Sequence, residues 1–103
     1  LFDVDFSSTK LERVRSGESA MDHAMLFTGV DLDEAGQPRA WRVENSWGDE
    51  PGDSGFFTMD DQWFTDNVFE VVVPKSALPE DLAAAVDSEP IVLTAWDPMG
   101  TLA

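Results

Sequence analysis

The spacing of hydrophobic and polar positions predicts a β-hairpin in the first half of the chain. Residues 23–30 are apolar and partly β-branched, and residues 39–45 alternate between polar and apolar side chains. Both patterns are typical of strands. The segment between them, Asp33–Pro38, is rich in turn-forming residues. We therefore expect two antiparallel strands joined by a short turn.

The hairpin would bring a histidine and an asparagine together. If the turn is centred between Glu34 and Ala35, the numbers of paired residues add up to about 69. His23 and Asn45 nearly satisfy this rule, although they are 22 positions apart. A period of two would place on one face His23, Met25, Phe27, Trp41, Val43 and Asn45. The prediction is a polar pair at the open end of an apolar strip, and a slip of one residue would shift it.

Shorter elements are expected on either side of the hairpin. Residues 1–17 are read as an irregular arm followed by a helix over Lys10–Arg15. Thr9 would cap this helix, with Glu12 completing a capping box. After a loop rich in glycine, Phe56–Met59 reads as a short strand. A helical turn with Asp60 as its cap would then cover residues 60–64.

The last third of the chain combines one strong strand signal with a helix and a tail. Val68–Val73 is the strongest strand signal in the sequence, and Pro74 would end it. Pro79–Val86 has the proline, acidic residues and alanine run of a helix. Residues 90–103 form the expected C-terminal tail, with an extended stretch at 91–93 and a turn from Trp96 to Gly100.

Composition limits the classes of protein to which the chain can belong. With 103 residues, it is expected to form a single domain over residues 1–103. A formal charge of -15 argues against partners such as nucleic acids or anionic membranes, because phosphate groups are bound by Lys and Arg. No apolar run approaches the length of a membrane helix. The start at Leu1 has no features of a signal peptide and no initiator Met, so we expect a fragment.

The predicted pair has a known chemistry. A neutral imidazole can take a proton from a nucleophile and return it to a leaving group. An Asn side-chain oxygen can fix the imidazole's tautomer, as in Cys-His-Asn triads. The indole of Trp47, just after Asn45, could shield their hydrogen bond from water. The chain contains no cysteine, so this chemistry would need a thiol from elsewhere.

Several motifs follow one another along the chain: His23-Ala24-Met25, Arg42-Val43-Glu44-Asn45-Ser46-Trp47-Gly48 with Gly52, Gly55 and Phe56, Trp63-Phe64, Phe69–Val73 and Ala95–Gly100. In this order they resemble those of papain-like cysteine peptidases, and in particular the bleomycin hydrolase and aminopeptidase C branch. The similarity runs from about residue 18 to 103. Pro51 and Phe56 differ from many papain-like enzymes, which have Trp and Tyr there.

The resemblance implies a fold and a function. The fold would be α+β, the C-terminal β-rich half of a papain-like fold, with an antiparallel sheet forming a partial barrel and short helices. The chain would be the C-terminal part of a cysteine aminopeptidase that hydrolyses peptide substrates. His23 would be the general base, Asn45 its orienting residue and Trp47 the shield. The Cys nucleophile and the oxyanion-hole Gln would lie in an earlier, Cys-bearing half, so this chain alone would be inactive.

The same resemblance implies features that the residues themselves do not reveal. The terminal carboxylate, at Ala103 if that is the natural end, would receive the free amine of the substrate. The family forms homohexamers, is cytoplasmic and needs no cofactor. A fragment exposing the surface normally covered by the missing half could self-associate.

Other interpretations of the same residues are weaker. Asp22 should not orient His23, because neighbours on a strand point to opposite faces. A calcium loop starting at Asp31 would need Glu where Arg42 stands, and one histidine without cysteine disfavours zinc. The main alternative function is a non-catalytic, acidic, β-rich interaction domain that keeps the peptidase scaffold. The sequence upstream of Leu1 would distinguish the two, because only the peptidase needs a Gln and a Cys-Trp there.

Overall fold

A computed structural model of the chain describes residues 7–100 and divides the chain into two compact units. One unit is the continuous stretch Met21–Val68. The other combines the residues before it with those from Phe69 onward. Each unit has its own local structure and is described separately.

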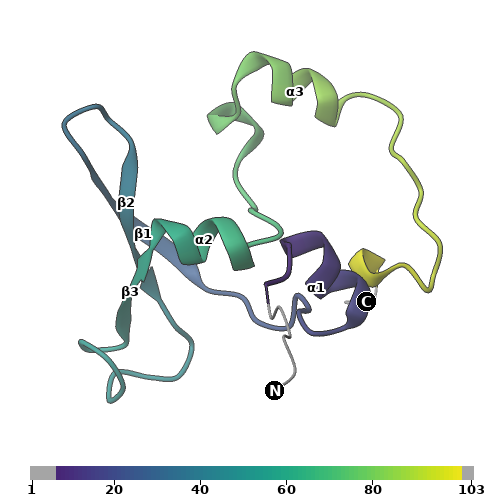
Figure 1. Ribbon diagram of the computed structural model, residues 1–103. Coiled ribbons are helices and arrows are strands. Elements are labelled where there is room, and N and C mark those ends of the chain that lie inside the picture. The colour runs from purple at the N-terminus through teal and green to yellow at the C-terminus, as the bar shows by residue number, and fades with distance from the viewer. Residues whose placement is uncertain (1–6, 101–103) are drawn as a thin grey trace, which may run out of the picture. The chain divides into compact units, whose positions relative to one another are not determined.

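The continuous unit is a three-stranded antiparallel sheet with one helix (Figure 1). Its strands are β1 (Leu26–Leu32), β2 (Pro38–Glu44) and β3 (Phe56–Asp60), arranged in the order β1-β2-β3. Helix α2 (Asp61–Asn67) follows β3 directly, and Asp60 caps it by accepting a hydrogen bond from the Trp63 N–H at 2.6 Å. The predicted hairpin, third strand and capped helical turn are therefore confirmed, with a longer helix than expected.

The register of the hairpin differs slightly from the prediction. Leu26 pairs with Glu44 rather than Val43, and beyond an irregularity between Phe27 and Gly29 the pairing moves one residue further. Such a bulge places one extra residue on one strand and changes the register locally. The prediction from sequence assumed a regular ladder with one constant register, so it could not include a bulge. Strand β1 also begins at Leu26, three residues later than expected.

One face of the sheet forms the core of this unit. Val43 is 1% exposed, the most buried described side chain, and it pairs with Phe57 of β3. On the same face Trp41 stacks on Phe64 of α2, with ring centroids 4.7 Å apart. The Trp41 indole Nε1–H also donates to Asp61 at 2.9 Å. Aromatic stacking and this hydrogen bond thus hold α2 against the sheet.

The second unit contains short helices. Helix α1 (Lys10–Ser16) has the predicted capping box between Thr9 and Glu12, and Gly17 ends it in the left-handed conformation. Helix α3 (Glu80–Val86) follows Pro79, as predicted. The single turns η1 (Lys75–Ala77) and η2 (Pro98–Gly100) complete the unit. A salt bridge joins Lys75 to Asp87, on the two sides of α3.

The strand predicted over Val68–Val73 is absent, and this prediction was wrong. Within residues 7–100 the segment contains no assigned strand and does not belong to the three-stranded sheet. Val72 is 89% exposed. A β-strand is stabilised by its hydrogen-bonded neighbour, so side-chain propensity alone does not form one. Residues 91–94 likewise belong to no regular element, and Trp96 is 81% exposed.

The observed architecture confirms the α+β class with an antiparallel sheet. The sheet of the described residues is open, so the expected partial barrel stays a prediction. Among the described residues, no helix has the length and apolar character needed to span a membrane.

Candidate active site

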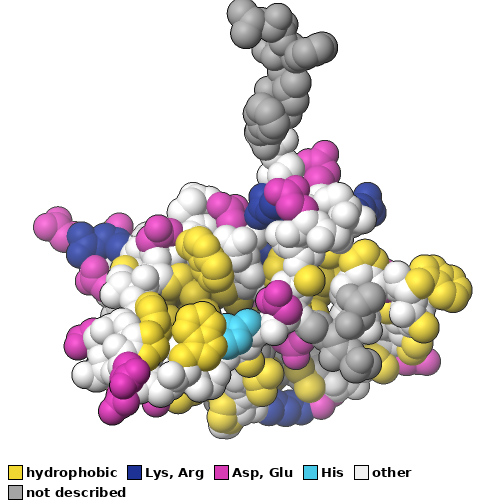
Figure 2. Space-filling model, turned by 90° about the horizontal axis from the view of Figure 1, so that it is seen from below, with side chains coloured by type: hydrophobic (Ala, Val, Ile, Leu, Met, Phe, Trp, Pro, Cys, Tyr) yellow, Lys and Arg dark blue, Asp and Glu magenta, His cyan; other side chains and the backbone are white. Residues whose placement is uncertain are grey.

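His23 and Asn45 meet at the open end of the hairpin, as predicted. Nε2 of His23 lies 2.8 Å from Oδ1 of Asn45. His23 precedes β1 and Asn45 directly follows β2, so both side chains extend from the strand ends rather than from the ladder. Figure 2 shows the chain's single histidine at the molecular surface beside hydrophobic side chains. A partner placed against this surface could therefore reach the imidazole.

The hydrogen bonds of Asn45 determine the imidazole tautomer. The backbone N–H of Ser46 donates to Oδ1 of Asn45 at 2.8 Å. A backbone N–H can only donate, so this Asn45 atom must be the carbonyl oxygen and not the amide nitrogen. The same oxygen faces His23, so Nε2 of His23 must carry the proton. In the neutral ring Nδ1 then has the lone pair and can accept a proton.

The loop that follows β2 holds Asn45 in place. The backbone N–H of Asn45 donates to the Gly55 carbonyl at 3.1 Å, which continues the pairing of β2 with β3 by one residue. Gly55 has a φ of +85°, and a Cβ there would lie 2.6 Å from the Gly48 carbonyl oxygen. The close approach of these two backbone segments therefore requires glycine.

Trp47 covers the imidazole. Its ring stacks on His23 with centroids 5.3 Å apart and planes inclined by 28°. This is the position from which an indole could limit the access of water to the His23–Asn45 hydrogen bond. The predicted neighbours His23, Asn45 and Trp47 thus form one cluster.

Phe57 is a further member of the cluster that sequence reasoning missed. Its ring meets Trp47 edge-on at 6.2 Å. Phe56 and Phe57 are neighbours on β3, so their side chains point to opposite faces of the sheet. One of the two must therefore lie on the same face as the candidate site, and this signal is present in the sequence. Phe57 is on the face of Val43, its partner on β2.

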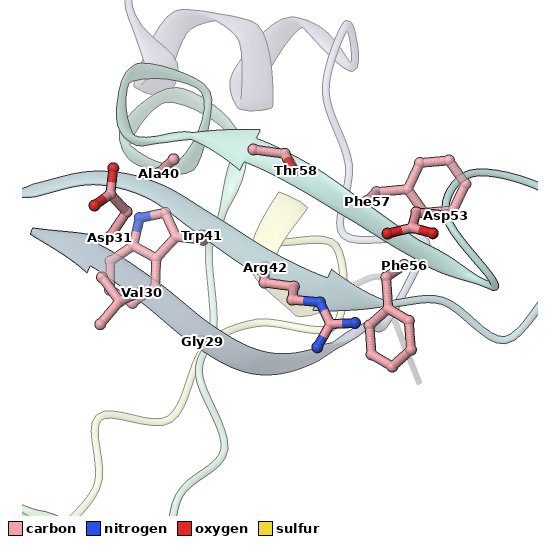
Figure 3. A pocket seen from close by; sticks show the side chains of 10 residues that line it. All are labelled: Gly29, Val30, Asp31, Ala40, Trp41, Arg42, Asp53, Phe56, Phe57 and Thr58. Atoms are coloured by element: carbon pink, nitrogen blue, oxygen red, sulfur yellow. The ribbon is translucent and has the colours of Figure 1, made fainter.

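Two surface hollows flank this part of the sheet. One has a volume of about 290 Å³ and lies beside the cluster; its lining includes Met25, Asn45, Trp47, Phe57 and Trp63. The other, of about 350 Å³, is drawn in Figure 3 and is lined by neither Asn45 nor Trp47. There the guanidinium of Arg42 lies 3.7 Å above the ring centroid of Phe56. The first hollow is therefore the one that belongs to the candidate site.

The remaining sequence candidates have structural roles or lie elsewhere. Within residues 7–100, no hydrogen bond joins Asp22 to His23. Asp33, in the segment considered as a calcium loop, accepts bonds from the backbone N–H groups of Ala35 and Gln37 and so shapes the turn. Ala103, the candidate for binding the substrate amine, lies outside the described residues.

Comparison with known proteins gives a consistent match over nearly the whole chain. Residues 1–100 match the model of the Peptidase C1-like family. The chain is 54% identical to aminopeptidase C of Lactobacillus helveticus, covering 100% of this chain and 23% of that protein. It is 51% identical to bleomycin hydrolase of Homo sapiens, covering 91% of this chain and 21% of that protein.

A solved structure agrees with these matches. The crystal structure of PepW from Lactobacillus rhamnosis HN001 has a TM-score of 0.82 and 48% sequence identity, covering 99% of this chain and 23% of that one. The resemblance to the bleomycin hydrolase and aminopeptidase C branch is therefore confirmed, and the match is to its C-terminal part. The chain spans less than a quarter of the length of these relatives.

Proposed function

The chain belongs to the Peptidase C1-like family, and from this premise we propose that it supplies the base and the orienting residue of a cysteine aminopeptidase. The observation that carries the proposal is the 2.8 Å contact between His23 Nε2 and Asn45 Oδ1. The second bond of this oxygen, from Ser46, leaves Nδ1 of His23 as the proton acceptor. The names of the relatives, aminopeptidase C and bleomycin hydrolase, support peptide bond cleavage.

The proposed reaction is amide hydrolysis through an acyl-enzyme. Nδ1 of His23 takes the proton of a cysteine thiol that lies outside this chain. The thiolate attacks the substrate carbonyl and forms a tetrahedral intermediate. The imidazolium returns the proton to the leaving amine as the C–N bond breaks. Water then attacks the thioester, with His23 again accepting the proton, and releases the acid and the thiol.

In this scheme Asn45 and Trp47 support His23 but exchange no proton with it. Asn45 keeps the proton on Nε2 and fixes the plane of the ring, so that Nδ1 points in one direction. Trp47 limits the access of water to the hydrogen bond between His23 and Asn45. The exposed position of His23 is consistent with a site completed by the Cys-bearing part of the protein.

The remaining features of the proposal rest on the family resemblance. The chain would form a single domain, residues 1–103, within a larger peptidase, with its sheet contributing to a partial barrel. The protein would be a cytoplasmic homohexamer acting on peptides, and the carboxylate of Ala103 would bind the substrate's free amine. A carboxylate fixed in a cleft pairs with an ammonium group and excludes substrates extended beyond it.

Substitution of His23 in the full-length protein tests the proposal. We expect His23→Ala to lower kcat/KM for an aminoacyl amide by about 10²- to 10⁴-fold. Asp22→Asn is the matched control and should retain most of the activity, because Asp22 has no hydrogen bond to the imidazole within the described chain. Full activity of His23→Ala would exclude the proposed role. A gene without Cys and Gln upstream would instead favour the non-catalytic interaction domain.

A further inference from the structure

Two aromatic contacts hold Trp47 in position. The indole is 64% exposed, so burial does not determine where it lies. It stacks on His23 and makes a T-shaped contact with Phe57. Trp47 also belongs to the loop between β2 and β3, next to Gly48, which adopts the left-handed conformation with a φ of +84°. Its orientation therefore depends on these neighbouring rings.

Phe57, by contrast, is anchored in the sheet. It lies on β3 and pairs with Val43, which is fully buried. The loop leaves room for its ring, because a Cβ at Gly52 would approach the ring atoms of Phe57 to 3.1 Å. Phe57 thus connects strand β3 with the exposed indole that stacks on His23.

We propose that Phe57 is a positioning residue of the candidate active site, acting through Trp47. This inference rests on the proposed function and extends it to a residue that, within the described chain, has no hydrogen bond or ring contact with His23 or Asn45. The T-shaped contact with the Phe57 ring restricts the tilt of the indole and keeps it stacked on the imidazole. Without that restriction, Trp47 would spend part of its time away from His23, and water would reach the His23–Asn45 bond.

Phe56 provides a matched control on the same strand. It is the immediate neighbour of Phe57 and has the same side chain, but its ring lies against Arg42 on the other face of the sheet (Figure 3). Substitution of Phe56 removes an aromatic ring from β3 without touching the contact with Trp47. An effect that follows substitution of Phe57 but not of Phe56 therefore comes from the face of the sheet on which Phe57 lies.

A double-mutant cycle in the full-length peptidase tests the proposal. We expect Phe57→Leu, which keeps an apolar side chain of similar size, to lower kcat about fivefold with KM unchanged, a change in the range of one lost aromatic contact. In a Trp47→Ala background the same substitution should have no further effect on kcat. Phe56→Leu should leave kcat within about twofold of the original value.

Each outcome of the cycle either supports or overturns the positioning role of Phe57. An equal effect of Phe57→Leu with and without Trp47, or no effect at all, would overturn the positioning role. If Phe57→Leu lowers the melting temperature markedly, Phe57→Met serves as the second variant, because Met adapts to irregular core space. His23→Ala is measured in the same series. If that variant stays active, the proposed function fails; if it is inactive and the cycle is additive, only the role of Phe57 fails.

Discussion

The side-chain oxygen of Asn45 lies 2.8 Å from Nε2 of His23, across 22 positions of sequence. The same oxygen accepts the Ser46 N–H, so it cannot rotate away without losing two hydrogen bonds. This double engagement is the observation from which we propose that Asn45 sets the orientation of the imidazole.

Loss of the Asn45 side chain should therefore impair catalysis more than folding. In the full-length protein we expect Asn45→Ala to lower kcat about 10²-fold, because a small misplacement of a catalytic group has an effect of that size. Steady-state kinetics on an aminoacyl amide measure it. Ser46→Ala is the control: it keeps the backbone N–H that Asn45 accepts, and its activity should be unchanged. Wild-type kcat in Asn45→Ala would refute the orienting role.

Deletion of Thr101–Ala103 should weaken the preference for a free amino terminus. The proposed carboxylate–ammonium pair is a charged hydrogen bond, and its loss should reduce the preference for a free over an acetylated substrate by roughly tenfold or more. The measurement is the ratio of kcat/KM for the two substrates. Thr101→Ala keeps the chain end and should keep the ratio. An unchanged ratio after deletion would mean that the tail does not select the amine.

Gly55→Ala should destabilise the protein more than Gly36→Ala. Both glycines have positive φ, +85° and +79°, and both substitutions introduce a strain of about 1–2 kcal/mol. At Gly36 a Cβ meets nothing within 4 Å, whereas at Gly55 it lies 2.6 Å from the Gly48 carbonyl oxygen. Backbone atoms cannot rotate aside, so we expect roughly 2 kcal/mol more for Gly55→Ala. Urea unfolding of the two variants gives the difference directly, and equal midpoints would contradict it.

The capping box of α1 should depend on pH. The Glu12 carboxylate accepts hydrogen bonds from the backbone N–H and the hydroxyl of Thr9, both at 2.8 Å, and these lower the pKa of Glu12 below its ordinary value. A lowered pKa in the folded state means that the bonds stabilise the helix above the ordinary pKa. The stabilisation is lost as the pH falls from the ordinary pKa through the lowered one.

Glu12→Gln and the original chain should therefore differ in stability at neutral pH and converge in acid. Thermal unfolding at a series of pH values would measure this difference. Glu34, an exposed residue of the hairpin turn, offers the control, since Glu34→Gln should show no such convergence. A pH-independent difference between Glu12→Gln and the original chain would show that the carboxylate charge does not contribute to the cap.

The parts of the fold that depend on local sequence were predictable. The hairpin, the capping box at Thr9 and the cap at Asp60 follow from residue types within a few positions of one another. The pairing of His23 with Asn45 was also predictable, because opposite ends of a hairpin meet even when the register changes by a residue. Their assignment as base and orienting residue still depends on the kinetic tests above.

Other features depend on neighbours that a linear pattern does not reveal. Val68–Val73 has the composition of a strand but is not part of the sheet in the described chain. The contact between Phe57 and Trp47 depends on the path of the loop between β2 and β3, which glycines at left-handed φ determine. The bulge between Phe27 and Gly29 is similarly a property of the paired strands.

The turn of the hairpin has a consequence for protein engineering. Asp33 closes it by accepting the N–H groups of Ala35 and Gln37, at the end of β1 and β2 opposite to His23 and Asn45. Extra residues inserted beside Gly36 would extend into solvent, and each doubling of loop length costs only about 0.6 kcal/mol in closure entropy. A reporter peptide or fluorophore could therefore be attached at this tip while the two strands still align the imidazole with its partner.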